Sequence, residues 1–119
     1  DLDEALRLGG RVGEYLSLRG TARKATKDMD GALQDFSEAV ELEPKRFDFR
    51  LNRGFLFLQR KDFENALADF DAVLQLQANE PMAYLGKSEV YRFQGRSDER
   101  MKMLDLIIAN DTPMRGIFQ

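Results

Sequence analysis

A block of sequence recurs at an interval of 34 residues, and this restricts the chain to repetitive architectures. Arg19-Gly20 returns as Arg53-Gly54, and the Ala-Leu-x-Asp-Phe segment at residues 32–36 returns at residues 66–70. A unit of this length cannot bury its apolar face alone, so such units stack on one another and present an extended surface. We therefore expect the function to lie on that surface rather than on a reactive side chain.

Each repeat contains two segments with helical periodicity, which we call the A helix and the B helix. With Pro44 as the end of one repeat, the pattern predicts A and B helices over 13–24 and 30–42, over 48–59 and 64–75, and over 82–93 and 98–109. The apolar positions follow the i, i+3, i+4, i+7 spacing of one buried face, most clearly at Phe63, Ala66, Leu67, Phe70, Val73 and Leu74. Turn and cap signals fall between these segments, at Asp28, Asp62, Gly95, Pro44, Pro81 and Pro113.

Gly20 and Gly54 occupy equivalent positions inside predicted A helices, where a glycine costs about 1 kcal/mol relative to alanine. Gly20 and Gly54 therefore need a packing reason, and we expect a close approach of the A helix to the B helix at Ala32 and Ala66.

The repeat register also gives a domain organisation. Residues 2–8 align with the last turns of the later B helices, so we expect the remnant of an earlier helix there. The chain then reads as one domain over 1–119, with repeats at about 13–46, 47–80 and 81–114 and a tail at 115–119. Further repeats are expected upstream in the parent protein.

Composition narrows the function classes. The net charge is −3 and the sequence pI about 5.0, which argues against a dedicated nucleic-acid binder, because such proteins carry a basic face. The sequence has no Cys and no His, so it lacks thiolate ligands and the commonest general base. No apolar run approaches the ~20 residues of a membrane span. We expect a soluble, intracellular protein of the cytoplasm or of an organelle interior such as a plastid or mitochondrion, without cofactor or metal.

The repeat resembles the tetratricopeptide repeat, a small residue followed by Ala-x3-Phe and then Pro. The residues that carry the resemblance are Gly20, Ala32, Phe36, Ala39 and Pro44, then Gly54, Phe57, Ala66, Phe70 and Val73. The third repeat departs from the pattern, with Ser88 in the glycine place and Arg100 in the alanine place. The resemblance implies an all-α, right-handed superhelical stack of antiparallel helix–turn–helix repeats. It implies a splayed third hairpin, or an Arg100 guanidinium that points outward.

The resemblance also implies a scaffold or adaptor that binds a protein, as a peptide or helix, in a concave groove lined by the A helices. One branch of the family grips acidic chaperone C-termini with Lys-x3-Asn, Asn and Lys-x3-Arg on three successive A helices. The matching positions here are taken as Ser17 and Thr21, Asn52, and Met82 and Gly86, of which only Asn52 agrees. We therefore expect no chaperone-tail binding through such a clamp.

With the A helices assigned as above, the predicted groove is mostly apolar. Its residues are Leu18, Thr21, Leu51, Asn52, Phe55, Leu58, Met82, Leu85, Glu89 and Phe93. The hypothesis is that an apolar or amphipathic segment packs there, with Asn52 bonding to its backbone. The alternative is that the second A helix is buried by its neighbours, and periodicity does not separate the two.

The C-terminal edge is a second candidate, because the last helix is apolar on more than one face. Met103, Leu106, Ile117 and Phe118 form this possible edge interface, and repeat arrays normally end in a polar cap. Either the tail folds back over the helix or another chain covers it, which would make the domain a structural or oligomerisation module.

Other functional signals are weaker. The segment from Asp28 to Gly31 resembles the start of a calcium loop but is followed by a helical run, so capping is favoured. Basic residues in the first two hairpins leave an RNA-binding repeat as a minor alternative. No serine has a His partner and no Gly-rich phosphate loop occurs, so we expect no enzyme.

Overall fold

The computed structural model describes residues 11–110, which form α helices joined by short turns and contain no strand. The helices are α2 (Val12–Ala25), α3 (Met29–Leu42), α4 (Phe47–Gln59), α5 (Phe63–Leu76), α6 (Pro81–Phe93) and α7 (Ser97–Ala109). The six helices predicted over residues 13–109 are present, and each boundary agrees within one residue. The predictions for residues 2–8, for Pro113 and for the tail at 115–119 concern residues outside the described range.

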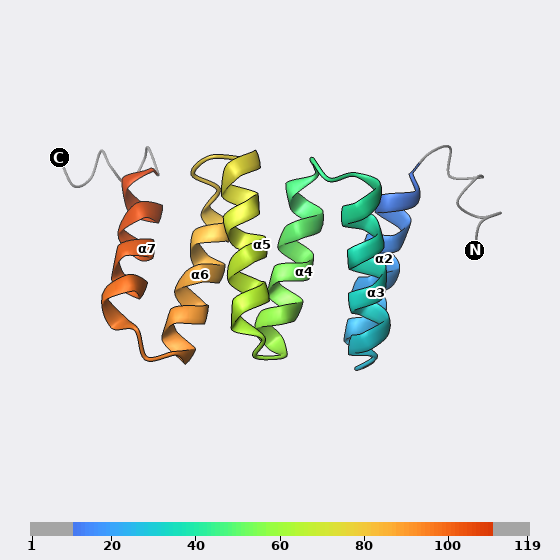
Figure 1. Cartoon of the computed structure of the whole chain (residues 1–119), viewed down its shortest axis with the longest axis horizontal. Coiled ribbons are helices and arrows are strands. Elements are labelled where there is room, and N and C mark those ends of the chain that lie inside the picture. Colours follow the sequence, from blue (N-terminus) through green and yellow to red (C-terminus); the bar gives the residue numbers. More distant parts are fainter. Residues whose placement is uncertain (1–10, 111–119) are drawn as a thin grey trace.

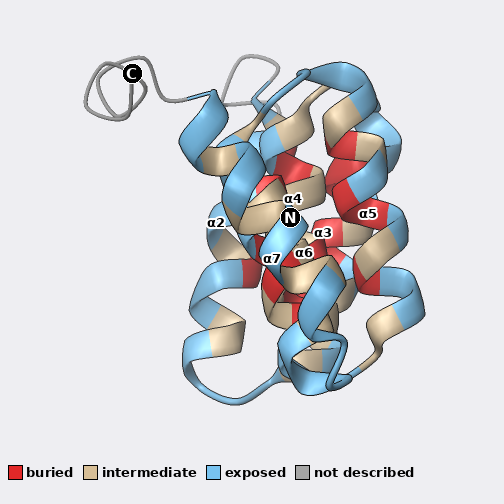
Figure 2. Ribbon diagram, turned by 90° about the vertical axis from the view of Figure 1, so that its left-hand side faces the viewer, coloured by how far each residue is buried: buried red, intermediate tan, exposed pale blue. Residues whose placement is uncertain are grey.

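The helices pair as α2 with α3, α4 with α5 and α6 with α7, and the pairs follow one another along one axis (Figure 1). The molecule is therefore elongated, with extents of 54 × 29 × 22 Å. The buried residues lie on the parts of the helices that face the interior, while the outward parts are exposed (Figure 2). The largest of them are Phe36, Phe49, Leu56, Phe70, Val73 and Val90.

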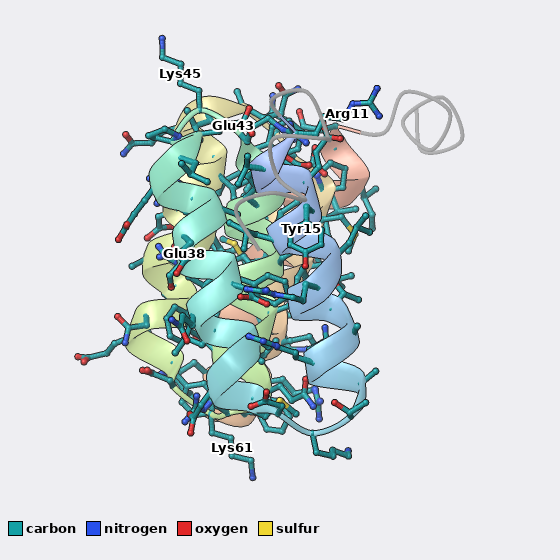
Figure 3. All side chains as sticks on the ribbon, turned by 90° about the vertical axis from the view of Figure 1, so that its right-hand side faces the viewer. Arg11, Tyr15, Glu38, Glu43, Lys45 and Lys61 are labelled. Atoms are coloured by element: carbon teal, nitrogen blue, oxygen red, sulfur yellow. The ribbon has the colours of Figure 1, made fainter. Side chains whose placement is uncertain are left out.

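The helices form two layers with different spacing. The A helices touch one another, since α4 contacts both α2 and α6. Among the described residues, the B helices α3, α5 and α7 make no contact with each other. A stack that is tight along one layer and open along the other curves toward the tight layer, so the A helices lie on the inner side. Figure 3 views this stack from its N-terminal end, where Tyr15 projects from α2 and Glu38 from α3.

Both helix-interior glycines have the packing reason that the sequence predicted, although their partner differs. A Cβ atom on Gly20 would lie 2.6 Å from the Phe36 ring, and one on Gly54 would lie 2.8 Å from the Phe70 ring. The close approach was predicted at Ala32 and Ala66, which are fully buried. The atoms nearest to the glycines belong instead to the phenylalanines one turn further along, whose rings lie over the space that a side chain would fill.

The turns follow the predicted chemistry in part. Asp28 caps α3, since its Oδ1 accepts a hydrogen bond of 3.0 Å from the Gly31 amide. Asp62 occupies the same N-cap position of α5 but accepts from the Asn65 side chain instead, at 2.8 Å. Gly95 has a φ of 71°, in the left-handed region that glycine adopts readily.

The third hairpin is the least buried, in line with its departures from the repeat pattern. Ser88 fits the glycine position because its hydroxyl donates to the Leu85 carbonyl at 2.7 Å, and it is 1% exposed. Arg100 is partly exposed, whereas Ala32 and Ala66 at the equivalent position are fully buried. Helix α7 packs on α6 but contains no buried residue.

Candidate interaction surface

The A-helix surface carries a group of exposed apolar side chains. Its most exposed members are Leu18 (73%), Phe93 (47%), Met82 (45%) and Leu85 (39%). A hydrogen bond of 2.7 Å from the Asn52 amide to the Ser17 hydroxyl fixes α4 beside α2. The structure therefore leaves apolar side chains exposed on α2 and α6, the first and third A helices.

The middle A helix has a different character. Leu58 is only 9% exposed and belongs to the core cluster around Phe70, so it cannot contribute much to a binding surface. Leu51 and Phe55 are half-buried and pack against that same cluster. The Phe55 ring meets Phe70 edge-on, with 5.0 Å between the ring centroids. On α4, core packing therefore takes up much of the face that the sequence predicted to be open.

The remaining predicted residues have partners within the chain. Thr21 is exposed and its hydroxyl donates to the Ser17 carbonyl at 3.0 Å. Glu89 accepts hydrogen bonds of 3.1 and 2.8 Å from Arg92. Phe93 stacks on Phe63 of α5, with 6.1 Å between ring centroids, and so sits at the end of α6 rather than beside Met82.

Arg46, near the start of α4, is the centre of a cluster of charged side chains. Arg46 donates two hydrogen bonds of 2.9 Å to Asp48 and a longer one of 3.5 Å to Glu14. Its guanidinium lies 4.2 Å from the centroid of the Phe49 ring. The hydrogen bonds from Arg46 lower the pKa of Asp48 below its ordinary value. The carboxylates at this end of the A helices are thus already neutralised by a cation of the same chain.

This cluster makes stability depend on pH in a defined direction. A carboxyl whose pKa is lowered on folding contributes stability above its unfolded pKa, and this is lost as pH falls through the folded pKa. We expect Asp48→Asn to lower the free energy of unfolding at pH 7 by less than about 1 kcal/mol, since the pair is exposed. The difference from wild type should shrink as pH falls through the lowered pKa of Asp48, and vanish once that carboxyl is protonated. Denaturant titrations at pH 7 and through the acid range measure it, and a difference that grows in acid would contradict this assignment.

Two equivalent buried ion pairs join the A and B helices. Asp35 accepts hydrogen bonds of 3.0 and 2.8 Å from Arg19, and Asp69 accepts two of 2.8 Å from Arg53. Both aspartates are nearly inaccessible, at 1% and 3% exposure. These pairs were not among the predicted features, although Arg and Asp recur in both repeats at a spacing of 16 residues.

Comparison with known families gives a match for residues 17–81 to the model of the tetratricopeptide repeat, which covers more than half of the chain. The chain belongs to the tetratricopeptide repeat family. The all-α, right-handed stack of helix–turn–helix repeats is thereby established. No curated protein matches this chain in sequence.

Solved structures of the same fold are similar in shape but distant in sequence. The tetratricopeptide repeat domain of Arabidopsis OM64 superposes with a TM-score of 0.77 at 18% identity, covering 88% of this chain and 89% of that one. The TPR2B domain of yeast Sti1, in a complex with Hsp70, gives 0.78 at 19%, covering 87% and 83%. The first such domain of Spaghetti (RPAP3), bound to the HSP90 peptide SRMEEVD, gives 0.77 at 16%, covering 89% and 86%.

The positions matched to the acidic-tail clamp from the sequence are Ser17 and Thr21, Asn52, and Met82 and Gly86. Ser17 and Asn52 lie next to each other, since the Asn52 amide donates to the Ser17 hydroxyl at 2.7 Å. None of these five residues is a cation.

The described helices also bear on two other classes of protein, those that span a membrane and those that bind a metal ion. None of the helices in residues 11–110 combines enough length with enough apolar sequence to span a bilayer. Among these residues, no three acidic side chains converge in the way a metal site would require. Asp28 is occupied as a helix cap.

Proposed function

We propose that this chain is a non-catalytic protein-interaction module, and that it binds an apolar or amphipathic segment of a partner on its A-helix surface. The observation that supports this most is the exposure of Met82 and Leu85 on α6, which contacts α4, where Leu51 and Phe55 are half-buried. Exposed apolar side chains that lie together usually mark an interaction site. Two of the similar structures are complexes with chaperones or chaperone peptides, so the fold can present a peptide-binding surface.

The chemistry of this surface favours apolar over acidic partners. Leu18, Met82 and Leu85 supply apolar area without hydrogen-bonding groups. Arg46 at the start of α4 and Arg92 in the last turn of α6 already bind Asp48 and Glu89. An acidic peptide would have to displace those carboxylates, whereas an apolar anchor gains from removing surface from water.

Asn52 is the polar group best placed to orient such a segment. Its amide nitrogen donates one hydrogen to Ser17, and an amide group has a second N–H and a carbonyl oxygen to offer. We propose that these bond to the backbone of the partner, while Leu51 and Leu85 contact its apolar side chains.

A light-activated crosslinker at Leu85 tests this placement directly. Leu85 on α6 and Leu76 at the end of α5 are exposed to almost the same degree, at 39% and 40%, so the second position is a matched control. Mass spectrometry should find partner peptides attached at position 85 and few at position 76. Equal labelling at both positions would place the contact elsewhere.

The acidic chaperone tail should bind poorly. We expect calorimetry with the peptide SRMEEVD, which the Spaghetti domain binds, to give a Kd weaker than about 1 mM, because the cations that would pair its carboxylates are missing. A variant with both clamp cations, Met82→Lys with Gly86→Arg, would not serve as a clean control, because an arginine at position 86 would collide with the Phe70 ring. Met82→Lys alone avoids that clash. Micromolar binding by the wild type would contradict the expectation.

A further inference from the structure

Each B helix that is followed by another hairpin packs against the A helix of that hairpin, and both such B helices use the same face. Helix α3 packs on α4, and α5 packs on α6. In the second of these junctions, the ring of Phe70 lies against the backbone of Gly86. Beside that contact, the Lys87 ammonium meets Asp71 Oδ1 at 2.6 Å. The junction thus joins an apolar residue of the B helix to a small residue of the A helix, with a cation–carboxylate pair next to it.

The first junction repeats the polar part of this arrangement one period earlier, although Asn52 stands in the place of Gly86. Arg53 occupies the place of Lys87 and Ser37 that of Asp71. Arg53 Nη1 reaches the Ser37 hydroxyl at 3.4 Å, while its other nitrogens bind Asp69. A basic residue on the arriving A helix therefore meets a polar residue on the B helix at both junctions.

Helix α7 carries the same face, and among residues 11–110 no following A helix packs on it. One period after α5, Phe70 becomes Leu104, Leu67 becomes Met101 and Leu74 becomes Ile108. Leu67 and Leu74 pack against the core, but Met101 and Ile108 are 56% and 39% exposed.

The charge of this face is repeated as well. Asp105 stands in the place of Asp71. Within residues 11–110, no basic side chain lies at ion-pair distance from it.

We propose that α7 accepts one further amphipathic helix from a partner protein, and that this helix presents a Lys or Arg to Asp105. The residue before that cation is small or aliphatic and lies on Leu104, as Gly86 lies on Phe70. Apolar residues one turn away cover Met101 and Ile108. This docking site is separate from the A-helix surface, and its test does not depend on the proposal made for that surface.

The chain itself provides a probe of the required chemistry. A capped synthetic peptide of residues 80–96 reproduces α6, which carries the Gly86-Lys87 pair and docks in this way on α5. Titrated into the isotope-labelled full chain, it should shift the amide resonances of α7 more than those of α2. Asp105→Lys should weaken its binding about fivefold to tenfold, because a like charge then faces Lys87 of the peptide.

A charge exchange separates this docking from unspecific apolar association. The peptide with Lys87→Glu should bind wild type weakly and regain affinity for the Asp105→Lys variant. Asp105 is exposed, so the variant should stay folded, which circular dichroism checks. Shifts confined to other helices, or binding that ignores both substitutions, would overturn the proposal.

Two other occupants of the face would also overturn it. If residues 111–119 cover α7, nuclear Overhauser contacts from Ile117 or Phe118 to Met101 should appear and the peptide should not bind. If a second copy covers it, the mass in sedimentation equilibrium should rise with concentration and return to that of a monomer in Ile108→Glu.

Discussion

Replacing Phe70 with alanine is expected to lower the free energy of unfolding by about 3–5 kcal/mol, the range for a fully buried phenylalanine. The Phe70 ring is 0% exposed and fills the space over two glycines, Gly54 of its own repeat and Gly86 of the next. It also meets the edge of Phe55. Its removal would leave a cavity shared by α4, α5 and α6, and the backbone around the glycines has no side chains with which to fill it.

Denaturant unfolding followed by circular dichroism measures this loss. Phe93→Ala provides the matched control, because Phe93 is 47% exposed and should cost no more than about 1 kcal/mol. A loss of less than about 1.5 kcal/mol for Phe70→Ala would mean that the helices close over the gap. The junction between the second and third repeats would then be more adaptable than the close packing suggests.

Replacing Asp69 with alanine should be about as damaging, at roughly 3–5 kcal/mol, because it removes one partner of a buried ion pair. Asp69 accepts two hydrogen bonds from Arg53 and lies 3.8 Å from Arg50. Without this carboxylate, Arg50 and Arg53 would both lose their ion-pair partner in the hairpin. The Nε of Arg50 is already buried without a hydrogen-bond partner, so it has no alternative acceptor nearby.

Two controls separate the cost of a broken pair from the value of the pair itself. Asp71→Ala removes an exposed carboxylate of the same helix, and it should cost less than about 1 kcal/mol. The double variant Arg53→Met with Asp69→Leu replaces both charges with apolar groups and should recover most of the loss, since apolar substitutes for buried pairs are often neutral or stabilising. A double variant as unstable as Asp69→Ala would contradict this account.

The fold could be predicted from the sequence because the repeat supplies the same information several times. The helix boundaries follow from the apolar spacing of the repeats and from Asp28, Pro44 and Pro81, and the structure confirms them within one residue. The glycines were correctly assigned to close helix approach. Their contact with Phe36 and Phe70 needed the rotamers of the rings, which no pattern of residue types contains.

The candidate surface was less predictable, for a physical reason. Phe55 and Leu58 have the same helical spacing as a groove face, but the packing of α4 against α5 and α6 buries Leu58 and half covers Phe55. A periodic apolar face has the same pattern whether a neighbouring repeat or a partner covers it. The Arg19–Asp35 and Arg53–Asp69 pairs were in principle detectable from their common spacing, although their burial was not.

The measurement that tests the proposed function most directly compares Leu85→Glu with Leu76→Glu. Both substitutions place a carboxylate at a leucine that is about 40% exposed, one on the A-helix surface and one at the end of a B helix. The captured partner in a native extract is quantified for each, after circular dichroism has shown that both variants are helical. We predict that Leu85→Glu loses the partner retained by wild type and by Leu76→Glu. Undiminished capture by folded Leu85→Glu would show that the A-helix surface is not the binding site.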